Sequence, residues 1–70
     1  MNKNEILNQI TALEYIVMSY FMNGRKYKEI SKIMNISVNI VKIQIYSVVK
    51  KLKADNQIHS AAILASLLYR

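Results

Sequence analysis

Residues 27 to 53 read YKEISKIMNISVNIVKIQIYSVVKKLK, and this stretch decides the fold. It holds no proline or glycine, and its apolar residues recur at steps of three and four, as on one face of a helix. Asn35 tolerates a left-handed backbone, and Ser37 is a good N-cap. The stretch therefore predicts a helix over about 27 to 34, a tight turn, and a helix from 38 to about 53. Two helices joined in this way are typical of a helix-turn-helix.

The second helix of this pair has two unlike faces. One is apolar and is expected to face the core; it consists of Val41, Ile45, Val48 and Leu52. The opposite face is basic, and it consists of Asn39, Lys42, Ile43, Tyr46 and Lys50. A lysine can donate to guanine O6 and N7, and an isoleucine can meet a thymine methyl group. We therefore expect Lys42, Ile43 and Tyr46 to contact DNA. The alternatives are a solvated lysine, an isoleucine at the edge of the core and a surface aromatic.

The segment before this pair predicts one more helix. Thr11 and Glu14 have the spacing of a capping box, and Gly24 suits the left-handed position after a helix end. Residues 1–9 are expected to form an N-terminal arm or an extra helical turn. The residues expected to face the core here and in 27–34 are Ile10, Leu13, Val17, Tyr20, Phe21, Ile30, Ile33 and Met34.

The segment after the pair predicts a fourth helix, over 56–69 with Asn56 as its cap. It is apolar on two sides. One stripe consists of Ile58, Ala61, Ala62, Ala65 and Leu68, and the other of Ile63, Leu64 and Leu67. A domain of 70 residues cannot bury both stripes against itself, so we expect a homodimer through this helix. Periodicity does not decide which stripe faces inward. The residues that we expect at the dimer seam are Ile63, Leu64, Leu67 and Leu68.

Positive charge is concentrated in the middle of the chain. The formal net charge is +6, but residues 24–53 hold eight Lys and Arg against Glu29 alone, a net +7. Such a field favours nucleic acid or anionic lipid as a partner; the alternative is a lysine face that serves only solubility.

Composition argues against most other classes of protein. There is no cysteine and only one histidine, so we expect no metal site, and no paired catalytic side chains are visible. We therefore expect a single non-enzymatic domain over 1–70 without a cofactor. No signal peptide or membrane-spanning run is present, which predicts a cytoplasmic protein that does not bind membranes. Ile, Asn and Lys supply 26 of the 70 residues, which suggests an AT-rich bacterial or phage genome.

The chain from Ile10 to Ala62 resembles the GerE/LuxR-type helix-turn-helix family of bacterial transcription regulators. The matching residues are Thr11, Glu14, Val17, Gly24, Lys28, Glu29, Ile30, Ile36, Ser37, Val41, Lys42, Lys51, Leu52 and Asn56. The resemblance implies an all-α domain of four helices, with the third in the major groove of double-stranded DNA and the fourth pairing two subunits. It places Lys42, Ile43 and Tyr46 near bases. The candidate DNA-binding residues are thus Lys42, Ile43, Tyr46, Asn39, Lys28, Lys50, Lys26 and Gln44.

The sequence departs from the family pattern at several positions. Ile40 replaces the usual threonine, Gln44 the usual histidine, and Leu13 and Ile16 replace charged residues. The basic face and the family resemblance together predict a sequence-specific transcription regulator that acts as a dimer. The alternative is a protein-interaction module, similar to the fourth region of sigma factors, that engages RNA polymerase or another regulator through the added apolar surface. A basic amphipathic protein at membranes is a third interpretation.

Overall fold

The computed structural model describes residues 3–68, with side chains from residue 5 onward, and within this range it contains five helices and no strand. The helices are α1 (Lys3–Asn8), α2 (Ala12–Met22), α3 (Tyr27–Met34), α4 (Val38–Lys51) and α5 (Gln57–Leu68). The all-α prediction is confirmed, and α1 is the extra turn. Residues 1–2 of the predicted arm and residue 69 of the predicted fourth helix lie outside the described residues.

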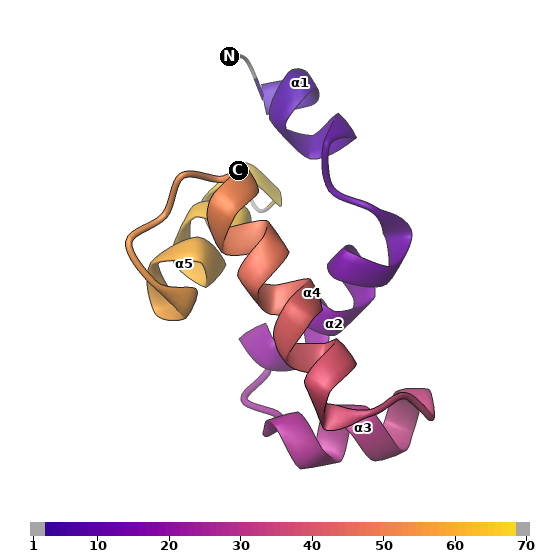
Figure 1. Cartoon of the computed structure of the whole chain (residues 1–70). Coiled ribbons are helices and arrows are strands. Elements are labelled where there is room, and N and C mark those ends of the chain that lie inside the picture. Colours follow the sequence, from indigo (N-terminus) through magenta and orange to yellow (C-terminus); the bar gives the residue numbers. More distant parts are fainter. Residues whose placement is uncertain (1–2, 69–70) are drawn as a thin grey trace.

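Helix α4 runs through the middle of the molecule (Figure 1) and packs against α2, α3 and α5. Helix α3 lies across the N-terminal end of α4, whereas α5 lies beside its C-terminal half. Helix α1 lies at the end of the molecule opposite α3, and its Leu7 packs against the core. This arrangement leaves one side of α4 uncovered.

The turn between α3 and α4 has the predicted chemistry. Asn35 ends α3 in the left-handed conformation, with φ 55° and ψ 46°. Ser37 caps α4, because its Oγ accepts from the backbone N–H of Ile40 at 3.0 Å. Ser31 adds a bond that the sequence did not indicate: its Oγ donates to the carbonyl oxygen of Ile36 at 2.5 Å. These local bonds fix the angle between the two helices.

The other helix ends also follow the sequence signals. The Oγ1 of Thr11 accepts from the N–H of Glu14 at 3.1 Å, and the Oε1 of Glu14 accepts from the N–H of Thr11 at 2.8 Å. Gly24 follows α2 with φ 85°. The Oδ1 of Asn56 accepts from the N–H of His59 at 2.8 Å and so caps α5.

The core is assembled from α2, α3, α4 and α5. Its fully buried members are Val17, Met18, Ile30, Val41, Ile45, Val48 and Leu64. The predicted inward face of α4 is therefore correct. The prediction was wrong for Leu13 and Ile33, which are 36% and 48% exposed. Glu14 takes the inward position beside Leu13, and α3 points Ile30 at the core, which leaves Ile33 at its edge.

The structure also corrects the expected dimer seam. Leu64 is 1% exposed and belongs to the core, so it cannot lie on an outer seam. Leu68 packs against the same core and is half-buried. The reason is that α5 turns Ser60 and Leu64, one helical turn apart, towards α2 and α4. Ser60 can be buried because its Oγ donates to the carbonyl oxygen of Gln57 at 2.6 Å. Ile63 and Leu67 are half-buried, and their place at a seam stays a prediction.

Candidate nucleic-acid interface

The uncovered side of α4 carries the residues that the sequence assigned to DNA. Ile43 and Tyr46 are 50% and 58% exposed, although both are large apolar or aromatic side chains. Asn39, Lys42 and Lys50 are exposed as well, and Gln44 is half-buried. A helix face with basic, apolar and aromatic groups side by side can supply both base and phosphate contacts. We call Asn39, Lys42, Ile43, Tyr46 and Lys50 the basic face of α4.

Two lysines of this face lie over tyrosine rings. The Nζ of Lys50 is 4.8 Å from the ring centroid of Tyr46, one turn earlier on the same helix. The Nζ of Lys42 is 5.9 Å from the ring centroid of Tyr27, which begins α3. An ammonium group is attracted to the negative face of an aromatic ring. Both ammonium groups thus lie close to the surface of the helix pair, each above an aromatic ring.

The loop before α3 adds more positive charge. Arg25, Lys26 and Lys28 are all exposed. Glu29 orders this loop: its Oε1 accepts from the backbone N–H of Lys26 at 2.9 Å, and its Oε2 lies 3.6 Å from Nη1 of Arg25. The hydrogen bond from Lys26 and the charge of Arg25 lower the pKa of Glu29. The Lys26 and Lys28 side chains remain available to an anionic partner such as a phosphate.

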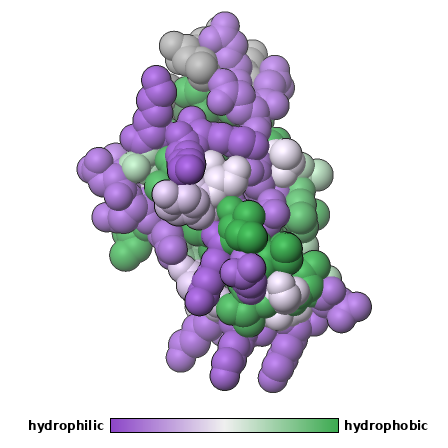
Figure 2. Space-filling view, in the orientation of Figure 1, coloured by the Kyte–Doolittle hydropathy of each residue, from purple (hydrophilic) through white to green (hydrophobic). Residues whose placement is uncertain are grey.

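The surface at this end of the molecule is visibly mixed. Figure 2 shows long hydrophilic side chains projecting from the end where α3 lies, with hydrophobic surface beside them. Three isoleucines of α3 and α4 are exposed, namely Ile33, Ile40 and Ile43. Nucleic-acid interfaces combine positive charge with such apolar contacts to bases.

An ion pair between a buried glutamate and a half-buried lysine, which sequence reasoning missed, connects α4 to α2. Glu14 is only 3% exposed, and its Oε1 lies 2.7 Å from the Nζ of Lys51 in the last turn of α4. Burial acts to raise the pKa of Glu14, but hydrogen bonds from Lys51, Ser47 and the Thr11 backbone lower it to about 2. The Lys51 side chain is therefore half-buried, and its ammonium group is paired with Glu14 within the protein.

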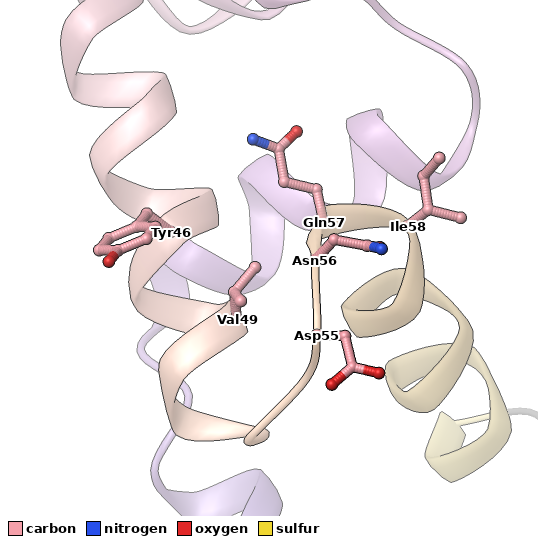
Figure 3. A pocket seen from close by; sticks show the side chains of 6 residues that line it. All are labelled: Tyr46, Val49, Asp55, Asn56, Gln57 and Ile58. Atoms are coloured by element: carbon pink, nitrogen blue, oxygen red, sulfur yellow. The ribbon is translucent and has the colours of Figure 1, made fainter.

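A cleft borders the basic face on its α5 side (Figure 3). Tyr46 and Val49 line it from α4, and the segment from Asp55 to Ile58 lines it from the turn before α5 and the first residues of α5. The one acidic group in this lining, Asp55, has a side chain that is 90% exposed and lies 3.6 Å from Nδ1 of His59. This lining therefore has no pair of buried acid–base groups of the kind that catalysis uses.

Within residues 3–68, no group of three or more His, Cys, Asp or Glu side chains could hold a metal ion. In the same range no helix has the length and apolar character needed to cross a membrane.

Comparison with known proteins identifies a family that matches most of the chain. The family model GerE, described as bacterial regulatory proteins of the luxR family, matches residues 8–64. The match includes all of α2, α3 and α4 and most of α5, and it agrees with the resemblance seen in the sequence. A search of curated proteins finds no match.

Proposed function

Because the chain belongs to the luxR family of bacterial regulatory proteins, we propose that it is a sequence-specific transcription regulator that binds duplex DNA as a dimer in the cytoplasm. The family is one of DNA-binding regulators and not of enzymes. The observation that carries the proposal is the basic face of α4, which no other helix covers and which presents Ile43 and Tyr46 half or more exposed.

In this proposal α4 lies in the major groove. Lys42 donates to guanine O6 or N7, and Ile43 meets a thymine methyl group. Tyr46 donates to a phosphate or packs on a sugar, while Asn39 and Gln44 make secondary contacts. The exposed Lys26, Lys28 and Lys50 neutralise phosphates, which supplies affinity without reading the sequence.

The dimer in this proposal forms through the outer face of α5. Its most exposed large apolar residue is Ile58, at 77%, and Ala62 follows one turn later. Together with the half-buried Ala65 they form the outer stripe of α5, where small side chains let two helices approach closely. Ile63 and Leu67 would flank this contact. A two-fold dimer would place two copies of α4 about 34 Å apart, one turn of DNA.

Selection of bound sites from random duplex DNA tests the proposal. The expected product is an inverted repeat whose half-sites are spaced by about one helical turn. The Lys42→Ala protein should enrich a less defined half-site, with binding to its best site weakened by about 1–3 kcal/mol. Recovery of no common sequence by the wild type, under conditions where circular dichroism shows it folded, would reject the proposal.

One observation favours a second candidate function. Leu13, Tyr15 and Ile16 on α2 are 36%, 42% and 44% exposed, so this helix presents large apolar and aromatic side chains to solvent. A protein-interaction module that engages RNA polymerase or another regulator would use such a surface. A salt titration separates the two candidates, because only direct DNA binding loses affinity steeply as salt rises.

A further inference from the structure

Tyr27 lies where four helices meet. It is the first residue of α3, and its ring stacks on Phe21 of α2, with centroids 6.4 Å apart and an interplanar angle of 28°. Its hydroxyl donates to Oε1 of Gln57, the first residue of α5. The Nζ of Lys42, in the first turns of α4, lies 5.9 Å from the ring centroid. One side chain therefore connects the proposed base-reading lysine to the rest of the fold.

The contacts of Tyr27 restrain its ring on two sides. Phe21 supports the ring, and the bond to Gln57 holds the hydroxyl end. A ring fixed in this way presents a stationary negative face to the Lys42 ammonium. Lysine has a long flexible side chain, and immobilising it on binding costs entropy. A lysine that is already held near its bound position loses less on binding.

We propose that Tyr27 is a positioning residue that holds Lys42 in place for base contact and thereby sharpens the choice of DNA site. The inference rests on the proposed function, in which Lys42 reads bases. In this proposal the ring of Tyr27 positions Lys42, and the hydroxyl of Tyr27 anchors the ring to α5. Tyr27 itself need not touch DNA.

The contact between Tyr27 and Lys42 is tested first without DNA. A proton above an aromatic ring is shifted upfield, so the ε-methylene protons of Lys42 should resonate upfield of those of the exposed Lys28 in nuclear magnetic resonance spectra. The shift should persist in Tyr27→Phe and vanish in Tyr27→Leu. Absence of the shift in the folded wild type would overturn the proposal before any DNA is added.

DNA binding is then measured on the selected site and on random duplex. Tyr27→Leu should weaken specific binding about two- to fivefold, the fold-change that corresponds to about 0.5–1 kcal/mol for a cation–π contact at an exposed position. Binding to random duplex should be unchanged. Tyr27→Phe should bind the selected site within about twofold of wild type, because the ring remains. Tyr15→Leu is the matched control, since Tyr15 is exposed on α2 and should leave both affinities unchanged.

A double-mutant cycle separates positioning from a general effect on folding. In the Lys42→Ala background, Tyr27→Leu should cause no further loss; an equal loss in both backgrounds would overturn the proposal. Should Tyr27→Leu unfold, Tyr27→Met fills the space without a ring and takes its place in every arm. If Lys42→Ala alone leaves specific binding intact, the proposed function of the basic face fails, even where the upfield shift is present.

Discussion

At the scale of single residues, Glu14 does two things with one carboxylate. It closes the capping box at the start of α2, and it holds Lys51 from the end of α4. A buried charge is stable only when it is paired and hydrogen-bonded, and Glu14 meets both conditions. The pair therefore fixes the C-terminal end of the helix that carries the basic face.

Glu14 predicts how stability depends on pH. Its pKa is lowered from 4.5 to about 2 in the folded protein, so the carboxylate contributes fully above pH 4.5. The contribution is then lost as the pH falls towards 2. Glu14→Gln should lower the free energy of unfolding by about 3 kcal/mol at pH 7, and the difference from wild type should shrink between pH 4.5 and 2. Urea unfolding followed by circular dichroism across this range measures it.

Glu29→Gln is the matched control for this experiment. Glu29 occupies the same capping-box position in α3, but its side chain is about half exposed and its partner Arg25 is exposed too. Exposed pairs contribute little to stability. A loss for Glu29→Gln as large as that for Glu14→Gln would show that capping, and not the pair with Lys51, accounts for the effect.

What the sequence could predict at this scale is set by distance along the chain. The caps at Thr11, Ser37 and Asn56 involve groups three residues apart, so the local sequence was sufficient to predict them. The bonds from Lys51 to Glu14 and from Tyr27 to Gln57 join residues 37 and 30 apart. Nothing local marks such a partner, because it depends on how the helices pack.

At the scale of helices, the sequence pattern indicates the buried side of α4 clearly but not that of α5. Helix α4 has one apolar and one basic side, so its buried Val41, Ile45 and Val48 were predicted correctly. Helix α5 is apolar on two sides, and the side it buries runs through Ser60, a polar residue. The sequence pattern therefore did not favour either apolar side of α5 as the buried one, and Leu64 was assigned to the wrong surface.

The outer stripe of α5 leads to a prediction about assembly. Ala62→Asp places a charge at the centre of the proposed contact twice, once from each subunit, and should convert dimers to monomers without unfolding. Sedimentation equilibrium at micromolar concentration measures the mass. Ala12→Asp on α2 is the matched control, since Ala12 is exposed at a helix start and should leave the mass unchanged.

Two more substitutions on α5 distinguish the possible seams. Leu64→Asp should abolish folding, because the side chain lies in the core. If Leu67→Asp gives monomers while Ala62→Asp stays dimeric, the contact runs along Ile63 and Leu67. A wild type that is monomeric and still binds an inverted repeat tightly would contradict the dimer altogether.

At the scale of the whole molecule, the structure shows which of the positive charges counted in the sequence are exposed and which are paired. Residues 24–53 carry a net +7, but this total includes Lys51, whose charge is paired with Glu14 outside that range. The remaining cations include exposed side chains of the loop before α3 and of the basic face of α4. A partner approaching from the α3 end meets both groups together, which favours an extended polyanion.

The salt dependence of DNA binding tests this arrangement. Each lysine that neutralises a phosphate releases counterions, so Lys28→Ala or Lys50→Ala should reduce the slope of log affinity against log salt by about one unit for each bound subunit. Both variants should weaken binding to all sequences alike. The double variant Glu14→Gln/Lys51→Met removes one positive and one negative charge and should leave the slope unchanged, because the Lys51 ammonium is already paired with Glu14. Since it also loses the inner ion pair, its fold is checked by circular dichroism. A slope reduced as much by this variant as by Lys50→Ala would mean that Lys51 turns outward to DNA. A loss confined to one base position in Lys50→Ala would mean that Lys50 reads bases.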